Sequence, residues 1–429
     1  MEISEIYKLL EDKLDKIVTD TRQIKKGDIF FALKGPNFNG NEFALQALEN
    51  GASYVIVDQF FKPEVKNMIL VPDVLTCLQN LARIHRQNLN IPSIGITGSN
   101  GKTTTKELLF SILSLWKNTL ATVGNFNNHI GVPLTILKLK STHEWMIIEL
   151  GANAPGNIEE LCSIADPDFA LITSLGKSHL EGFGSFEKLI ETKMELFEFV
   201  EKKSGKLFFN LNDPNIQKWY KPSDNHIGFG DDTTESKYQF KLLESHPKIK
   251  LQQIQPVEEI FETELFGEHN YQNVIAAITI SQSIGVPISL IRQGLKNYIP
   301  SNMRSQILEW RNNKVILDAY NANPASMKSA LVSLSQFDTS PKLAILGKMA
   351  ELGEFSNEEH QKILEFSLNL AIDKILCVGG EWPVIEHQKL IYKSTVDEAK
   401  LYLNNIQSEG QTILIKGSRS AALENLLKE

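Results

Sequence analysis

The segment SIGITGSNGKTTTKELL, residues 93–109, holds the residue types best suited to bind phosphate. Its apolar start predicts a strand, GSNG predicts a turn, and the stretch after it predicts a helix with leucines at helical spacing. Gly98 and Gly101 let the backbone turn tightly and approach an anion, and the free N–H groups at a helix start carry partial positive charge. The pattern therefore predicts a phosphate-binding loop at a strand-to-helix junction.

Lys102 directly follows this turn and can hold the outer phosphates of a nucleotide, while a threonine hydroxyl can bind Mg²⁺. The spacing differs from the commonest phosphate loop, because Ile96 stands where a glycine is usual. A glycine-rich turn without any ligand is the alternative interpretation. We expect a nucleotide site formed by Gly98, Ser99, Asn100, Gly101, Lys102, Thr103 and Thr104.

Polar side chains also follow the next two apolar runs. Glu149 ends the run WMIIE, and a carboxylate beside a phosphate loop suits Mg²⁺. His179 follows the run FALITSL in a loop, where a lone histidine is more often structural than a ligand. A solvated Glu149 and a structural His179 therefore remain alternatives to a metal site.

Lys193 interrupts an apolar stripe. The helix expected over FEKLIETKMELFEFV places Lys193 on one face with Phe186, Leu189, Leu196 and Val200. A buried ammonium is costly unless it is paired or neutralised. Two interpretations stay open: a lysine that reaches the surface over its apolar neighbours, or one that is chemically modified or paired with the phosphate site.

Asn270 and Asn273 lie one helical turn apart in HNYQN, so both amides can face one ligand, such as an adenine edge. Capping of the helix by Asn270 is the alternative. Arg304 follows an expected domain junction, from which a guanidinium can reach a phosphate when domains close.

The segment ILDAYNANPASM contains both structural and binding candidates. Asp318 ends its apolar run, and Asn323 with Pro324 forms a good N-cap and first-turn pair for the following helix. Capping explains only this pair. The remaining polar candidates, here and at the strand-to-helix turn in IKGSRS, are Tyr320, Asn321, Lys416 and Arg419.

Composition restricts the class of protein. The 429 residues are 42% hydrophobic and 22% charged, as in ordinary globular proteins, and the formal net charge of −8 argues against nucleic acid as a partner. No apolar run approaches the ~20 residues of a membrane helix, and the start lacks the pattern of a signal peptide. Because Cys77, Cys162 and Cys377 are widely spaced, we expect a reduced, cytoplasmic protein.

Strand-like and helix-like segments alternate in three blocks, which predicts an α/β protein of three domains. The first domain is expected over residues 1–88. The second, over 89–300, is expected to hold the phosphate loop on a parallel sheet, and its more polar stretch near 205–265 suggests an antiparallel extension. In the third, over 301–429, the runs KVILD, KLAILG, DKILCVGG and TILIKG predict a small Rossmann-like domain.

Taken in order, these segments resemble the Mur ligases, the ATP-dependent amide ligases of peptidoglycan precursor synthesis. DAYNANP and GNFNNHIGVP are similar to the member that adds D-alanyl-D-alanine to a UDP-N-acetylmuramoyl-tripeptide. VTDTRQIKKGDIFFALKGPNFNGNEF resembles the uridine-nucleotide domain of that member. The resemblance covers nearly the whole chain and includes TGSNGKTTTKE, IELGAN, SHLEGFGS, ETKMELF, HNYQN, MRSQ and IKGSRS.

The resemblance implies ATP and Mg²⁺ as cofactors, an acyl-phosphate intermediate and a lysine carbamylated by CO₂. The catalytic residues it implies are Lys102, His179 and Lys193. The Mg²⁺ ligands would be Thr103, Glu149, His179 and the carbamate on Lys193. ATP would also contact Asn270, Asn273, Arg304 and Asp318. Substrate contacts would come from Thr21, Arg22, Asn125, Asn127, Asn128, Tyr320, Asn321 and Lys416. We expect a monomer that binds the two substrates.

One segment departs from the family pattern. AILGKMAELGE resembles a segment that usually reads Gly-Asp-Met, and Lys348 reverses the charge at the Asp position. The departure either alters the acceptor site of the last domain or lies at the surface, where it has no effect.

Other interpretations remain. A diaminopimelate- or lysine-adding Mur ligase often carries Asp-Asn-Pro-Arg, which the sequence lacks, and folylpolyglutamate synthetase lacks the N-terminal domain expected here. A regulatory GTPase would show Asn-Lys-x-Asp, also missing. A catalytically silent homologue is disfavoured because Lys102, Glu149, His179 and Lys193 are intact.

Overall fold

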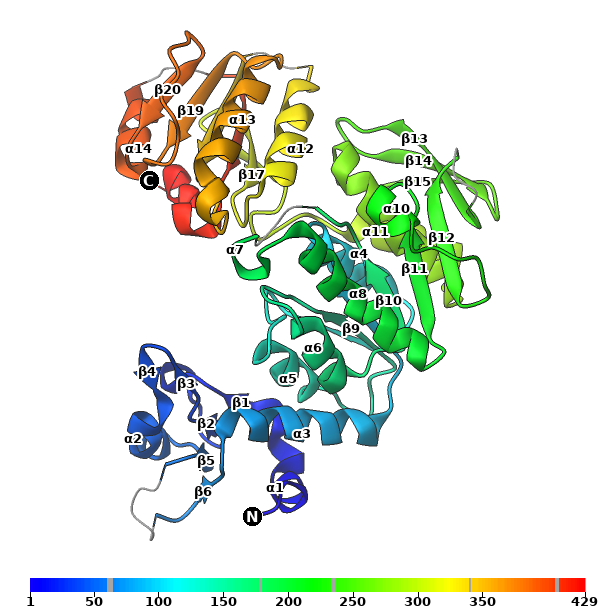
Figure 1. The fold of residues 1–429 in the computed structure, drawn as a ribbon, viewed down its shortest axis with the longest axis vertical. Helices are drawn as coiled ribbons and strands as arrows, with labels where there is room; N and C mark the ends of the chain where they lie inside the picture. The colour runs from blue at the N-terminus through cyan, green and yellow to red at the C-terminus, as the bar shows by residue number, and fades with distance from the viewer. Residues whose placement is uncertain (60–64, 177–179, 233–235, 339–340, 406–408, 429) are drawn as a thin grey trace.

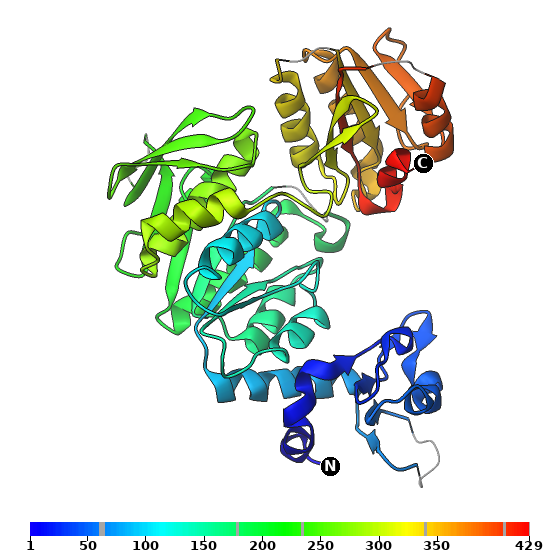
Figure 2. The ribbon, with the colours of Figure 1, turned by 180° about the vertical axis from the view of Figure 1, so that it is seen from behind.

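The computed structural model describes residues 1–59, 65–176, 180–232, 236–338, 341–405 and 409–428. In both ribbon views, a central region carries the N-terminal region at one end and the C-terminal region at the other (Figure 1, Figure 2). Each region is built on a sheet of its own, with four, nine and six strands in chain order. The predicted three-domain α/β class is confirmed, while the exact domain limits at residues 88 and 300 stay predictions.

The N-terminal sheet is entirely parallel. Its strands, in spatial order, are β1 (Ile17–Val18), β2 (Ile29–Phe31), β5 (Tyr54–Val57) and β6 (Met68–Leu70). A separate hairpin pairs β3 (Lys34–Gly35) with β4 (Phe38–Asn39). The helices of this region are α1 (Ile3–Leu10), α2 (Ala44–Glu49) and the long α3 (Val74–Leu89).

Helix α3 joins the N-terminal region to the central one, and Arg86 is its main anchor. This arginine is only 2% exposed. Its guanidinium donates to the carbonyls of Ala165 and Asp166 at 2.9 and 3.0 Å, to the Ser93 hydroxyl at 2.8 Å and to the Asp168 carboxylate at 3.1 Å. Because Ser93 starts the strand that leads into the phosphate loop, the anchor ties the linker to the base of the site.

The middle of the central sheet brings three strand ends together. β7 (Ser93–Thr97) runs parallel to β9 (Trp145–Glu149) on one side and to β10 (Phe169–Ile172) on the other. The register pairs Ile96 with Glu149 and Thr97 with Ile172. The carboxyl ends of the three strands therefore lie side by side, at the edge where open α/β sheets bind ligands.

Helices cover both faces of this sheet, so its strands are apolar on both sides. Residues of β9 alternate between the two cores, since Met146 and Ile148 pack in one and Ile147 in the other. The phosphate-loop helix α4 (Lys102–Leu113) buries Leu108, Leu109, Ile112 and Leu113 as predicted. It packs against α10 (Glu268–Ser283) and α11 (Ile288–Asn297), while the opposite face carries α5 (Gly131–Ile136), α6 (Asn157–Ala165) and α8 (Phe186–Lys202).

The predicted antiparallel extension was half wrong. Strands β11 (Lys206–Asn210) and β12 (His226–Asp231) continue the parallel sheet beyond β10, and β13 (Tyr238–Glu244) joins them in parallel. Antiparallel pairing begins only at β14 (Lys250–Gln255), which pairs with β13 on one side and with β15 (Glu259–Glu262) on the other. Buried runs such as LFFN fit a doubly covered parallel strand, whereas the alternating polarity of β14 fits an antiparallel edge. The other edge is β8 (Thr119–Ala121), and short helices α7 (Leu180–Phe183) and α9 (Pro214–Gln217) complete the region.

The C-terminal sheet contains the four predicted strands, all parallel: β17 (Asn313–Asp318), β21 (Thr412–Lys416), β18 (Lys342–Gly347) and β19 (Lys374–Val378). Sequence patterning missed the two edges, antiparallel β16 (Gln306–Trp310) and parallel β20 (Leu390–Lys393), which are only partly buried. The helices are α12 (Pro324–Ser335), α13 (Ser356–Leu368) and α14 (Val396–Asn405). No described helix is long and apolar enough to cross a membrane.

Replacing Arg86 with Met should lower the melting temperature by roughly 5 °C, because buried carbonyls lose their donor while the apolar stem stays. Differential scanning calorimetry measures the shift. Arg83→Met on the same helix is the matched control, because its bonds to Ser163 are exposed and it should shift the transition by about 1 °C or less. Equal shifts for the two variants would contradict the anchoring role of Arg86.

Candidate functional site

A cavity of ≈ 870 Å³ lies where the carboxyl ends of the central and C-terminal sheets face each other. The phosphate-loop residues line it from Ser99 to Thr104, with Asn125, Asn127 and Asn128 on one side and Asn270 and Asn273 on another. The C-terminal region contributes Arg304, Asp318, Tyr320, Asn321 and Lys416. The structure thus brings most of the predicted site residues to a single cavity.

The phosphate loop needs its two glycines. Gly98 has φ +144° and Gly101 has φ +83°, conformations that disfavour other residues. A Cβ atom on Gly98 would collide with the Thr173 hydroxyl, and one on Gly101 would collide with the Asn273 amide oxygen. Close packing, and not only turn geometry, therefore requires glycine at both positions.

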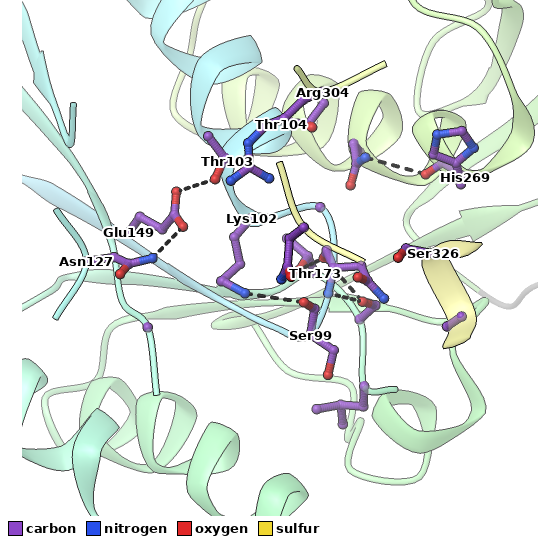
Figure 3. Close-up of a pocket in the computed structure, with 18 of the residues that line it drawn as sticks. Ser99, Lys102, Thr103, Thr104, Asn127, Glu149, Thr173, His269, Arg304 and Ser326 are labelled. Carbon is purple, nitrogen blue, oxygen red and sulfur yellow. Dashed lines mark hydrogen bonds between the residues drawn. The ribbon is translucent and has the colours of Figure 1, made fainter. Parts of the chain in front are cut away.

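Residues after β10 hold the loop in shape. The Ser99 hydroxyl donates to the Gly176 carbonyl at 2.6 Å. The Thr173 hydroxyl, which Figure 3 shows beside the loop, donates to the Asn100 carbonyl at 2.6 Å. The Asn100 N–H donates to the Ser174 hydroxyl at 3.1 Å. Sequence reasoning missed Thr173 and Ser174, although polar residues directly after a buried strand were the same signal that singled out Glu149.

The Lys102 side chain folds back toward the phosphate loop that precedes it. Its ammonium donates to the Gly98 carbonyl at 2.6 Å and reaches the Ser99 carbonyl at 3.4 Å, the second of which Figure 3 draws. Burial lowers the pKa of Lys102 below its ordinary value, Glu149 opposes that shift and Arg304 adds to it. An ammonium held among carbonyls beside a helix N-terminus can exchange those partners for phosphate oxygens.

Glu149 lies at the end of β9 and is buried, which excludes the solvated alternative. Its two oxygens accept from the Thr103 hydroxyl at 2.9 Å and from the Asn127 amide at 2.8 Å (Figure 3). A carboxylate beside a hydroxyl at this edge is an oxygen donor set that suits Mg²⁺. Within the described ranges no three His, Cys, Asp or Glu side chains cluster around a metal position, and the predicted ligand His179 lies outside those ranges.

Lys193 is buried on α8, with 1% of its surface exposed, so it does not reach the surface. That alternative from the sequence was wrong. Burial lowers the pKa of Lys193 well below its ordinary value, and the neighbouring Lys102 lowers it further. The amine therefore lies close to the phosphate loop, although Lys193 is not among the residues that line the cavity.

The asparagine pair lies inside α10, whose N-cap is Gly267, so capping by Asn270 was wrong. The Asn273 amide donates to the Asn270 side-chain oxygen at 3.2 Å, and Asn270 donates to the Phe266 carbonyl at 3.0 Å. The adjacent His269 accepts from the Asn270 amide at 3.1 Å, and burial lowers its pKa to about 4. His269 is therefore a neutral member of the cavity wall that sequence reasoning did not select.

An ion pair lies at the C-terminal side of the cavity. The buried Lys416 ammonium donates to the Asp318 carboxylate at 2.6 Å and reaches the Asn321 carbonyl at 3.3 Å. Burial alone would raise the pKa of Asp318, but Lys416 lowers it below the ordinary value. The Arg304 guanidinium stacks on the Tyr320 ring, 3.9 Å from its centroid.

Several predicted residues lie elsewhere or have a second role. Thr21 and Arg22 are absent from the cavity wall, and Arg22 pairs with Asp20 at 2.7 Å in an exposed turn of the N-terminal region. Asn128 also accepts from the Gly131 N–H at 2.9 Å, at the start of α5. Lys348 forms an ion pair with Glu381 at 3.2 Å, also away from the cavity wall.

These features define a three-domain α/β protein with a nucleotide-type phosphate loop. Comparison with protein-family models gives three matches: "Mur ligase family, catalytic domain" over residues 13–86, "Mur ligase middle domain" over 96–281, and "Mur ligase, glutamate ligase domain" over 303–419. The chain belongs to the Mur ligase family, as its motifs indicated.

Named relatives refine the comparison. The UDP-N-acetylmuramoyl-tripeptide–D-alanyl-D-alanine ligase of Bacillus subtilis is 33% identical over 425 residues, with 96% of this chain and 92% of the relative covered. The Escherichia coli ligase of the same name is 33% identical, with 97% and 93% covered.

Solved structures agree. A MurF structure from Acinetobacter baumannii superposes with a TM-score of 0.86 at 32% identity, covering 96% of this chain and 92% of the other. The MurF ligase of Thermotoga maritima in complex with ADP gives a TM-score of 0.85 at 28% identity, with 97% of both chains covered.

Replacing Lys102 with Met should weaken binding of a non-hydrolysable ATP analogue by about ten- to hundredfold, because a charge-assisted bond to phosphate is lost. Isothermal titration calorimetry measures the affinity. Lys138→Met, at an exposed lysine, should bind like the unaltered protein. Unchanged affinity in Lys102→Met would exclude this loop as the phosphate site.

Proposed function

We propose that the protein joins D-alanyl-D-alanine to a UDP-N-acetylmuramoyl-tripeptide with hydrolysis of ATP, in peptidoglycan precursor synthesis. One observation carries the proposal: a phosphate loop and the strand ends of a second Rossmann-like region line one cavity. Such a cavity lets a phosphorylated group and an incoming amine meet away from water. The names of the relatives that match nearly the whole chain support the choice of substrates.

The proposed reaction has two steps. The terminal carboxylate oxygen of the tripeptide attacks the γ-phosphorus of ATP, the bond to the bridging oxygen breaks, and ADP leaves. The dipeptide amine then attacks the acyl carbon, the carbon–oxygen bond to phosphate breaks, and the amine loses a proton. Lys102 and Arg304, which both line the cavity, would neutralise the negative charge that develops on the transferring phosphoryl group.

Glu149 and Thr103 would hold Mg²⁺, which when bound neutralises phosphate charge. Their oxygens lie 2.9 Å apart at the strand end, a donor set that fits the ion. His179 and a carbamate on Lys193 would coordinate a second Mg²⁺ ion. Adenine would lie near Asn270 and Asn273, with its ribose near Asp318. These roles follow the family resemblance and are part of the proposal.

The UDP moiety is proposed to contact Thr21 and Arg22 in the N-terminal region. Asn125, Asn127 and Asn128 would contact the muramoyl peptide, while Tyr320, Asn321 and Lys416 would bind the dipeptide. Since one chain lines the whole cavity, we propose that the protein acts as a monomer. Three buried free cysteines fit a reduced compartment, which supports the cytoplasm.

We expect ADP release to require both a UDP-muramoyl tripeptide and D-alanyl-D-alanine. A coupled ADP assay across a small panel of muramoyl peptides and amine acceptors measures this dependence, with mass spectrometry of the product. Diaminopimelate and lysine, offered with a UDP-muramoyl dipeptide, test the other Mur-type reactions. Release that ignores every muramoyl peptide and every acceptor would exclude ligase activity.

Lys193 is proposed to be carbamylated, since only a neutral amine adds CO₂ and burial lowers the pKa of Lys193, which favours the neutral form. Lys193→Ala should lose ligase activity while keeping its fold, and short carboxylates should restore part of it. Lys188→Ala, at an exposed lysine on the same helix, should keep full activity. Undiminished activity in Lys193→Ala would refute the role.

The same assignment has a pH signature. Protonation of the amine removes the nucleophile, so the carbamate signal in ¹³C NMR after labelling with ¹³CO₂ is followed while the pH is lowered. It should disappear as the pH falls through the lowered pKa of Lys193. Lys193→Ala should show no such signal at any pH.

A further inference from the structure

Helix α12 is the element through which the C-terminal region docks on the central one. Beyond its C-terminal end, the Phe337 ring meets His246 edge-on at 5.0 Å and Phe266 at 5.6 Å, both from the central region. Phe266 is buried in the same apolar cluster as Met327 and Leu331 of α12. This end of the helix therefore makes a largely aromatic and apolar contact between the two regions.

The other end of α12 makes a polar contact at the phosphate loop. Asn323 caps the helix, because its side-chain oxygen accepts from the Ser326 N–H at 2.9 Å. The amide nitrogen of the same side chain donates to the side-chain oxygen of Asn100 at 2.8 Å. Asn323 is only 5% exposed, so water competes little for this bond.

Asn100 is well placed to receive that contact. Its backbone carbonyl and N–H are already bonded to Thr173 and Ser174 of the central region. Its side chain is thus a rigid extension of the phosphate loop toward the C-terminal region. The sequence explained Asn323 by capping alone. Capping does not account for the bond that its amide nitrogen donates to Asn100.

We propose that Asn323 is a positioning residue that, through Asn100, aligns the acceptor-binding region with the phosphate loop. This inference rests on the proposed ligase function. The bond between Asn323 and Asn100 fixes the distance between the phosphate loop and residues 318–321. Only one residue separates that segment from the helix cap at Asn323. Without that bond, α12 keeps its contacts with Phe266 and His246 but loses its directional attachment at its N-terminal end, so the acceptor residues can move away from the reacting carbon.

The consequence is a loss of coupling between the two chemical steps. A misaligned amine leaves the acyl phosphate open to water, so ADP is released without peptide product. A single hydrogen bond of ordinary strength predicts about fivefold slower ligation. A residue that only stabilised the helix would lower the amount of folded enzyme but would not change the ratio of product to ADP.

Two variants separate the bond from the cap. Asn323→Ser keeps a good N-cap but is too short to reach Asn100, and Asn100→Ala removes the partner without touching the helix. Asn323→Ala, which removes both cap and bond, is the control for stability. We expect Asn323→Ser to keep the melting temperature, to lower kcat by about fivefold and to release more ADP than ligated product.

A double-mutant cycle with the UDP-muramoyl tripeptide and D-alanyl-D-alanine decides the matter. If both changes remove one shared bond, the double variant should ligate no more slowly than the slower single variant. Effects that multiply, to about 25-fold for two fivefold losses, would show independent residues and overturn the inference. Unchanged rates and product-to-ADP ratios in both single variants would do the same. An unaltered enzyme inactive with these substrates would instead refute the proposed function, and the inference with it.

Discussion

The parallel register of three central strands is the constraint on which the site depends. Because β7 runs between β9 and β10 in the same direction, the phosphate loop, Glu149 and Thr173 emerge at one edge of the sheet. Helix α4 then presents its N-terminus at that edge. Each of these groups belongs to a buried strand or helix that two apolar cores hold, so the site has little freedom to deform.

The edge also brings basic groups together, and Glu149 is the acidic group that opposes them at Lys102. Lys102 disfavours the charged form of Lys193, and Arg304 in turn disfavours the charged form of Lys102. Such an arrangement costs stability in the absence of ligands, and anions relieve it. A nucleotide phosphate supplies the required negative charge. The electrostatics therefore favour a site that is completed by its substrates.

The C-terminal region completes the cavity, and α12 is attached to the central region at both ends. Phe337 makes an apolar contact, whereas Asn323 makes a single hydrogen bond to Asn100. The apolar contact is non-directional, while the amide bond demands one geometry. The two ends therefore differ in function: one supplies adhesion, and the other supplies alignment between regions that are more than 200 residues apart in sequence.

The sequence by itself determined the elements with strong local signals: the strands before and after the phosphate loop, the glycines of its turn, and the cap at Asn323. It also determined the family, because ordered motifs extend along the chain. Tertiary structure alone decided how distant residues combine, since register, burial and domain docking are long-range. It placed Asn270 inside a helix, buried Lys193 and paired Asn323 with Asn100. Local patterns carry no information about such pairs, because packing between elements, and not propensity, brings them within hydrogen-bond distance.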